Sequence, residues 1–230
     1  MKIAGLQKTT LVDYPGKVAC TLFTQGCNYR CGYCHNPALL STEGADPVIP
    51  ETEFLEWLAT KKKWLDGVCV TGGEPTLQAD LPEFLAKIKE LGFLVKLDSN
   101  GSNPRMLEKM FDAKSIDFLA MDIKAPLEKY RTVVNAGVDL NAINESVQII
   151  RERAPDYEFR TTVAPDWYSM EDALAIGTWL EGAKAYFIQN FVPEHAVNAM
   201  FREKRFFTRK ELEELKAALE PFFGTVGIRE

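Results

Sequence analysis

The sequence predicts an α/β protein built as an incomplete (β/α)6 TIM-like barrel, and three observations predict it. Short apolar, β-branched segments alternate with longer amphipathic segments, which is the pattern of a parallel sheet built from βαβ units. Six such units follow an N-terminal hairpin around residues 2–17, fewer than the eight units of a closed barrel. No linker or change in composition divides the chain, so residues 1–230 are expected to form one domain.

The predicted strands are short apolar runs that end at glycine or polar residues. They cover residues 18–24, 67–71, 93–98, 116–122, 157–163, 185–191 and 226–229. In the strand at 157–163, alternation places Glu158, Arg160 and Thr162 on one face. A charged residue in such a strand must face water or a lined cavity. Arg160 is therefore either a residue of the barrel lumen or a member of an ordinary ion pair.

The predicted helices carry an apolar stripe at helical spacing. They cover residues 51–65, 104–113, 141–153, 169–180 and 208–219, with a further helix after Asp80. Asp80 and Glu83 have the spacing of a capping box, which predicts that the Asp80 side chain caps this helix. Gly92 is expected to end the same helix.

The composition is that of an ordinary soluble globular protein, with 46% hydrophobic and 26% charged residues. A net charge of −6 argues against the broad cationic surface that binds nucleic acid. Residues 1–8 lack the uninterrupted apolar stretch of a signal peptide, and no apolar run is long enough to cross a bilayer. We therefore expect a cytoplasmic protein without a membrane partner, in a compartment where thiols stay reduced.

Three cysteines, Cys27, Cys31 and Cys34, form a C-x3-C-x2-C array. Such closely spaced thiolates can hold a [4Fe–4S] cluster, although these clusters usually take four cysteine ligands. The two remaining cysteines, Cys20 and Cys69, lie in apolar strand segments and are expected to be small buried hydrophobes. The array therefore predicts a cluster with one iron left open, at which a small molecule can bind and be activated.

A structural zinc site is the alternative interpretation of the three cysteines. Neither His35, which is adjacent to the array, nor the remote His195 completes a familiar zinc spacing. The pattern therefore favours iron and sulfur over zinc. An acid–base role for His195 or a polar role for Gln189 stays open, with an ordinary structural histidine as the favoured interpretation.

Polar residues follow several predicted strands at the end where barrels of this type place their chemistry. Gly72 and Gly73 permit close backbone approach, and Glu74 adds a charged acceptor. Asp98 and Ser99 end the next strand before an ordinary Asn-Gly turn pair. Farther along the chain, two residues spaced to share one face are candidates too, with a surface salt bridge as the alternative: Asp122 and Lys124.

These motifs together resemble the radical S-adenosylmethionine (SAM) superfamily, whose cluster motif is similar to CNYRCGYC. LVDYPGKVA at residues 11–19, CHNP at 34–37 and GGEP at 72–75 resemble the activating proteins of anaerobic ribonucleotide reductases. DSNG and MDIK extend the resemblance to the wider group of glycyl-radical-enzyme activases. The resemblance covers nearly the whole chain and implies a barrel of the radical SAM type.

The resemblance implies that SAM chelates the open iron through its amino and carboxylate groups. The reduced cluster then cleaves SAM to methionine and a 5′-deoxyadenosyl radical, which takes a hydrogen atom from a backbone glycine of a partner enzyme. The implied partner is an anaerobic ribonucleotide reductase, and the implied electron donor is a flavodoxin or a ferredoxin.

The resemblance also assigns roles to individual residues. It gives Gly72, Gly73 and Glu74 to the SAM amino group, and Asp98 and Ser99 to the ribose or methionyl side, with a bound monovalent cation left open. Three further assignments concern single side chains. Lys124 neutralises the SAM carboxylate, Asp122 orients the sugar or a cation, and Tyr33 stacks near the adenine or packs over the cluster. The lumen interpretation adds Arg160 to the cofactor-binding set.

Two other functions remain open from the sequence. One is a radical SAM enzyme that acts on a small molecule, such as a deazapurine-forming ring-contraction enzyme. The other is an iron–sulfur electron carrier without SAM chemistry, which the recurrence of GGEP, DSNG and MDIK at strand ends disfavours.

Overall fold

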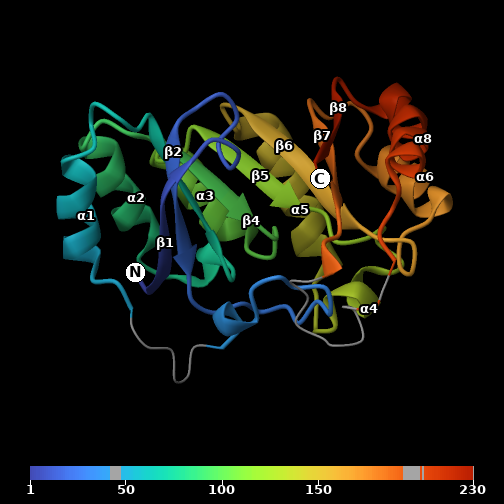
Figure 1. Ribbon diagram of the computed structural model, residues 1–230, viewed down its shortest axis with the longest axis horizontal. Helices are drawn as coiled ribbons and strands as arrows, with labels where there is room; N and C mark the ends of the chain where they lie inside the picture. The colour runs from blue at the N-terminus through green and yellow to red at the C-terminus, as the bar shows by residue number, and fades with distance from the viewer. Residues whose placement is uncertain (42–47, 194–202, 204, 230) are drawn as a thin grey trace. The chain divides into compact units, whose positions relative to one another are not determined.

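The computed structural model describes residues 1–41, 48–193, 203 and 205–229, and it has the predicted alternation of strands and helices (Figure 1). The strands are β1 Ile3–Thr10, β2 Ala19–Thr24, β3 Gly67–Gly72, β4 Leu94–Ser99, β5 Phe118–Asp122, β6 Tyr157–Val163, β7 Tyr186–Asn190 and β8 Val226–Arg229. The α-helices are α1 Glu51–Ala59, α2 Leu81–Glu90, α3 Pro104–Asp112, α4 Tyr130–Val134, α5 Leu140–Arg153, α6 Met170–Trp179 and α8 Arg209–Leu219. Short 3-10 helices cover Pro37–Leu39, Pro75–Leu77 and Glu220–Phe222.

The strands of the described residues form one sheet in chain order, from β1 to β8. The hairpin strand β1 is antiparallel to β2, whereas β2, β3 and β4, and likewise β6, β7 and β8, pair in parallel. Parallel neighbours need a crossover connection, and the helices between the strands supply it. This order leaves β1 and β8 at the two edges of the described sheet. The predicted α/β class and incomplete barrel topology are confirmed.

The chain divides into two compact units. The first unit comprises Met1–Asn28, Ala38–Ala120 and Asn141–Asp156, and the second comprises Tyr29–Pro37, Met121–Leu140 and Tyr157–Glu230. The expectation that residues 1–230 act as one domain stays a prediction.

The core of the first unit lies between its strands and α2. The predicted apolar stripe of α2 is buried at Leu81, Phe84, Leu85 and Ile88. On the strand side, Val95 in β4 is fully buried. Each such side chain stabilises the fold by about 1.5–3 kcal/mol when it leaves water. This packing holds β3 and β4 in register, so the residues that follow these strands emerge at the same edge of the sheet.

The core of the second unit joins α6 and α8 to β7 and β8, which lie beside α8 in Figure 1. The apolar face of α8 buries Leu212, Leu215 and Leu219. In α6, a Cβ at Gly177 would stand 2.6 Å from the ring of Phe222. The absence of a side chain at Gly177 therefore allows the segment after α8 to approach α6.

The predicted capping box at Asp80 is wrong. Asp80 precedes α2 as expected, but its side chain makes no capping hydrogen bond. The Asp80 carboxylate instead pairs with the N-terminal ammonium of Met1. A charged partner brought in by the fold thus replaces the local cap.

The helix predicted over residues 51–65 is shorter in the structure, because α1 ends at Ala59 and Thr60 turns its hydroxyl back to the carbonyl of Trp57 at 2.7 Å. The short α4 was not predicted, since five residues are too few for a helical period to show. None of the described helices combines the length and the apolar character that crossing a bilayer requires.

Candidate cofactor-binding site

None of the five cysteines, all of which lie in the described residues, forms a disulfide. Cys20 and Cys69 are fully buried in β2 and β3, as the sequence predicts, and burial raises the pKa of Cys20 to about 12. In the motif, Cys31 is buried while Cys27 and Cys34 are partly exposed. Within the described residues, no three His, Cys, Asp or Glu side chains are grouped around a position for a single metal ion. Three reduced cysteines at this spacing are chemically a donor set for an iron–sulfur cluster.

Cys27 belongs to the first unit, where its loop is tied to the end of β3. The carbonyl of Gly26 accepts a hydrogen bond from the backbone N–H of Glu74 at 2.8 Å. A Cβ at Gly73 would lie only 2.0 Å from that carbonyl oxygen, so glycine is required at this position. The loop that carries Cys27 and the GGEP segment are therefore held against each other by their backbones.

Glu74 connects the ends of β3 and β4. Its side chain is almost fully buried, and its carboxylate accepts hydrogen bonds from the Ser99 hydroxyl at 2.8 Å and the Asn100 backbone N–H at 2.7 Å. Thr76 donates to the same carboxylate through its N–H and its hydroxyl, at 3.1 and 2.5 Å. Burial raises the pKa of Glu74, and these donors partly oppose that effect. Glu74 thus organises two strand ends through neutral donors.

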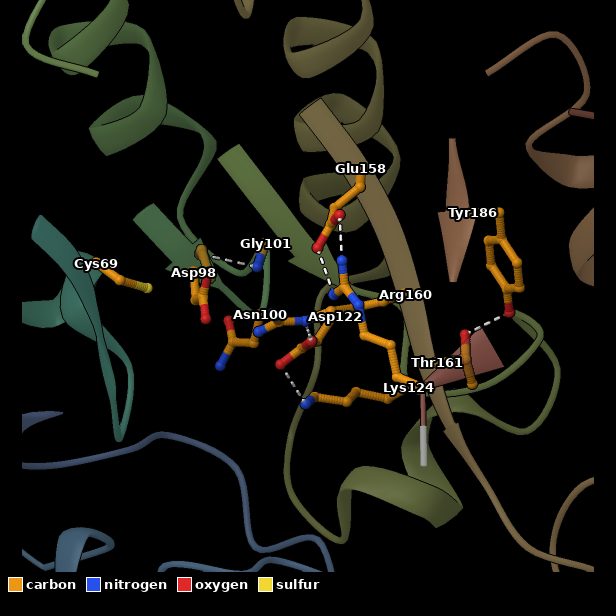
Figure 2. A network of polar contacts seen from close by, with 12 residues as sticks. Cys69, Asp98, Asn100, Gly101, Asp122, Lys124, Glu158, Arg160, Thr161 and Tyr186 are labelled. Carbon is orange, nitrogen blue, oxygen red and sulfur yellow. Dashed lines mark hydrogen bonds and ion pairs between the residues drawn. The ribbon is translucent and has the colours of Figure 1, made fainter. Parts of the chain in front are cut away.

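The DSNG segment extends this network back to the cysteine loop. The Asn100 amide donates to the side-chain oxygen of Asn28 at 2.9 Å, and the Asn28 amide donates to the Ser102 hydroxyl at 2.9 Å. The hydroxyl of Ser99 also accepts from the Gly101 backbone N–H at 3.1 Å, a bond drawn to Gly101 in Figure 2. Cys27 therefore lies between two residues, Gly26 and Asn28, that are bonded to the GGEP and DSNG segments.

Lys96 was not among the predicted site residues, although it lies two residues before Asp98. The Lys96 side chain is 1% exposed and forms an ion pair with the Asp98 carboxylate. Its ammonium also lies 3.9 Å from the sulfur of Cys69 and 5.8 Å from the ring centre of Phe118. The available signal was the spacing, because residues i and i+2 of a strand share a face.

In the second unit, Asp122 at the end of β5 is held by two cations (Figure 2). The Lys124 ammonium donates to one carboxylate oxygen at 3.0 Å, and the Arg160 side chain donates to the other at 2.5 Å. The Ile123 N–H also bonds the Arg160 carbonyl at 2.8 Å, which joins β5 to β6. Arg160 is therefore part of an ion pair, and its partner is itself a predicted site residue.

The charges of this trio support one another. Burial alone raises the pKa of Asp122, but Arg160 and Lys124 outweigh it and hold the pKa well below its usual range. Burial likewise lowers the pKa of Lys124, but Asp122 outweighs it and keeps that pKa well above its usual range. All three groups are charged at neutral pH, so the trio carries one net positive charge.

Cys31, Tyr33 and Cys34 also belong to the second unit. The Cys34 backbone N–H donates to the Cys31 carbonyl at 3.0 Å, so residues 31–34 form a tight turn. Burial raises the pKa of the Cys31 thiol, and the Lys124 ammonium opposes that effect across the same unit. The ring of Tyr33 stacks on Trp167, with 5.2 Å between centroids and 8° between planes. One face of the Tyr33 ring is thus covered by protein.

Two residues that the sequence left open receive no role here. Gln189 lies in β7, paired in register with Thr162 and Arg229. His195 lies outside the described residues.

Comparisons with known proteins agree with these motifs. The family model for the Radical SAM superfamily matches residues 21–172. A Methanocaldococcus jannaschii protein named as a glycyl-radical enzyme activating enzyme is 30% identical over 236 residues, which cover 99% of this chain and 95% of that protein. The pyruvate formate-lyase-activating enzyme of Clostridium pasteurianum is 36% identical over 131 residues, 54% of this chain and 52% of that enzyme. The match to the latter thus spans about half of each chain.

Solved structures share the fold. Streptococcus suis SuiB bound to S-adenosylmethionine aligns with a TM-score of 0.67 at 14% identity, over 88% of this chain and 48% of SuiB. A domain of pyruvate-formate lyase-activating enzyme from Bacteroides vulgatus aligns with a TM-score of 0.56 at 14% identity, over 71% of this chain and 99% of that domain.

Proposed function

Because the chain belongs to the radical SAM superfamily and, within it, to the glycyl-radical enzyme activating enzymes, we propose that it activates an anaerobic ribonucleotide reductase. The observation that carries an activating function is the similarity to the archaeal relative, which spans 99% of this chain. The family uses a [4Fe–4S] cluster and SAM and acts on glycyl-radical enzymes. When bound, such a cluster would supply the electron that cleaves SAM to methionine and a 5′-deoxyadenosyl radical, which would take a hydrogen atom from the partner's glycine.

In this proposal Cys27, Cys31 and Cys34 ligate the cluster. The donor chemistry supports this, since none of the three is in a disulfide and the other two cysteines are fully buried in strands. Thiolates are the ligating form, so a cation near a buried thiol favours ligation. The Lys124 ammonium has that effect on Cys31.

The second step of the proposal assigns the SAM carboxylate to Lys124. A charge-assisted bond between ammonium and carboxylate is roughly twice as strong as a neutral one. The pKa of Lys124 is held well above its usual range, so the ammonium is present at neutral pH. Asp122 orients Lys124 and Arg160, and the net positive charge of the trio favours an anionic group.

The third step assigns the SAM amino group to the GGEP segment. Gly72 and Gly73 carry no side chains, and their backbone is fixed against the Cys27 loop. The Glu74 carboxylate already accepts four donors from the chain, so its part is to hold this backbone in place. Asp98 and Ser99 then face the ribose or methionyl side.

The proposed partner follows from motifs rather than from contacts. LVDYPGKVA and CHNP resemble the activating proteins of anaerobic ribonucleotide reductases. Only two cysteines remain outside the cluster motif, which argues against activases that carry additional clusters. Hydrogen abstraction needs the reacting atoms in near contact, so a loop of the partner must reach SAM. We further propose a flavodoxin or a ferredoxin as the electron donor and the cytoplasm as the compartment.

The test is to incubate the anaerobically reconstituted, reduced protein with SAM and an anaerobic ribonucleotide reductase. We expect a glycyl-radical doublet in the electron paramagnetic resonance spectrum of the reductase. The matched control is the same reductase with its radical glycine changed to alanine, which should give no doublet. A doublet on pyruvate formate-lyase but not on the reductase would overturn the partner. Cleavage of SAM without a radical on either enzyme would overturn the activating function and favour a small-molecule substrate.

A further inference from the structure

Lys96 is a buried cation that the steps above leave without a role. It lies in β4, two residues before Asp98 and on the same face of the strand. Its side chain is 1% exposed, and the paired Asp98 side chain is 10% exposed. The sulfur of Cys69 and the ring of Phe118 also lie near its ammonium. The Lys96 ammonium is thus buried beside two weakly polar groups and forms an ion pair with the Asp98 carboxylate.

Such a pair is a poor device for stability. Removing two charges from water costs several kcal/mol per ion, and apolar residues of similar size often serve a core equally well. The place of the pair is more informative. Asp98 is followed directly by Ser99 and Asn100, which both donate to Glu74. Lys96 is therefore paired with the carboxylate of the first residue of the DSNG segment.

The resemblance to glycyl-radical-enzyme activases left a bound monovalent cation open at Asp98 and Asp122. The charges in the structure do not fit a free cation at either residue. The Asp98 carboxylate is already paired with Lys96, and the Asp122 carboxylate is already paired with Lys124 and Arg160. Each candidate carboxylate thus has a positive charge that belongs to the chain.

We propose that Lys96 is a built-in counter-ion for Asp98, which takes the place of a free monovalent cation. Lys96 is a positioning residue in this scheme, because it acts on SAM through Asp98. As a result, the chain binds SAM without added Na⁺ or K⁺. The inference rests on the proposed placement of SAM beside Asp98, and it is independent of the identity of the partner enzyme.

The first test uses the chain without its cluster and measures thermal unfolding in NaCl, KCl and tetramethylammonium chloride at equal ionic strength. Tetramethylammonium is too large to enter a buried site. The Lys96→Met variant removes the ammonium that pairs with the Asp98 carboxylate, so a small cation should bind there in its place and stabilise the variant. We expect its Tm to rise by about 5 °C in Na⁺ or K⁺ over tetramethylammonium. The wild-type Tm should respond to the three salts without such a preference.

The matched control is Lys89→Met, which removes another lysine–aspartate pair from the first unit. Lys89 bonds Asp117 at 2.6 Å, and both side chains are about one-third exposed. Its Tm should show the salt response of the wild type. A Lys96→Met variant without a preference for Na⁺ or K⁺ overturns the proposal, and so does a wild-type chain with the preference expected of the variant.

The second test measures SAM affinity in the reconstituted protein, without a partner enzyme. Wild-type affinity should stay within about twofold across the three salts, whereas Lys96→Met should bind SAM about tenfold more weakly in tetramethylammonium than in K⁺. If Lys96→Met does not fold, the double variant Lys96→Met/Asp98→Asn removes both charges. That variant should bind SAM about tenfold more weakly in every salt. Unchanged affinity in the double variant overturns the proposal, while a failure of radical transfer alone would concern only the proposed function.

Discussion

Two carboxylates at strand ends, one in each unit, are held in opposite ways. Glu74 accepts hydrogen bonds from hydroxyl and backbone N–H groups, and burial raises its pKa. Asp122 accepts from Lys124 and Arg160, which hold its pKa well below the usual range. The same functional group thus accepts hydrogen bonds from neutral donors in one unit and forms ion pairs in the other.

This difference indicates that Glu74 and Asp122 have different structural roles. The partners of Glu74 include the backbone N–H groups of Thr76 and Asn100, which follow β3 and β4, so this carboxylate fixes the path of the chain there. The partners of Asp122 are long, charged side chains, so this carboxylate fixes where positive charge stands. A ligand with amino and carboxylate groups needs both a shaped backbone and a positioned cation.

If the three motif cysteines ligate one cluster, removal from either unit must have the same effect. Cys27→Ala in the first unit and Cys31→Ala in the second should each lose the site-bound cluster and SAM cleavage together. Iron content, the visible spectrum and release of 5′-deoxyadenosine measure this loss. Cys20→Ala is the control and should keep its cluster. SAM cleavage retained by Cys31→Ala would rule out the ligand assignment.

Asp122→Asn should be the most destabilising change among the two carboxylates. It removes the negative charge that two largely buried cations share, which costs about 3 kcal/mol in the free energy of unfolding. Urea denaturation at neutral pH measures this cost. The control is Asp112→Asn, whose partner Arg153 and own side chain are more exposed, and it should cost less than about 1 kcal/mol. Equal costs for the two variants would break the comparison.

Lys124→Ala tests the cation that Asp122 positions. Loss of a charge-assisted bond to the SAM carboxylate should weaken SAM binding by about 10- to 100-fold in the protein that carries its cluster. Calorimetric titration of SAM into the reconstituted protein measures the affinity. Lys129→Ala removes a pair with Asp172 in the same unit and should leave SAM affinity as in the wild type. Unchanged affinity in Lys124→Ala would remove that residue from the site.

Glu74→Gln should cost less than Asp122→Asn, about 1–2 kcal/mol in the free energy of unfolding. The amide of glutamine keeps one acceptor oxygen. Its NH2 group replaces the other oxygen and would face a donor, either the Asn100 N–H or the hydroxyls of Ser99 and Thr76. Urea denaturation again measures the effect. A cost above that of Asp122→Asn would show that neutral donors, rather than ion pairs, dominate these strand ends.

The smallest expected effect is a pH dependence. The contributions of Glu74 and Asp122 to the free energy of unfolding should change with pH in opposite directions. The raised pKa of Glu74 means that its contribution is present below its ordinary value of 4.5 and is lost as the pH rises through the folded-state pKa. The lowered pKa of Asp122 means that its contribution is present above 3.8 and is lost as the pH falls through the folded-state pKa. The stability gap between wild type and Glu74→Gln should therefore shrink with rising pH, and the gap to Asp122→Asn should shrink with falling pH. Gaps that change in the same direction would contradict the assignment.

The fold was largely predictable because its signals are local. The strand predicted over residues 157–163 coincides with β6, and α2 buries the apolar stripe read from its sequence. The cap at Asp80 failed for the complementary reason. Its carboxylate pairs with the ammonium of Met1, 79 residues away, and no local pattern reports that contact.

The candidate site divides along the same line. The cysteine array and the GGEP, DSNG and MDIK segments were visible as spacing and strand-end chemistry. Lys96 was missed because a lysine in a strand is usually exposed, and only its enclosure beside Asp98 distinguishes it. The pairing of Asp122 with Arg160 joins residues 38 positions apart on neighbouring strands, so it was open until the strands were placed.

The sequence by itself determined the alternation of strands and helices, the cluster ligands as a prediction, and the family to which the motifs belong. Only the tertiary structure decided which carboxylate is held by neutral donors, which is held by cations, and that a lysine is buried against Asp98. The physical reason is that spacing and periodicity are properties of neighbouring residues. Burial and ion pairing depend on the distances that packing sets between distant parts of the chain.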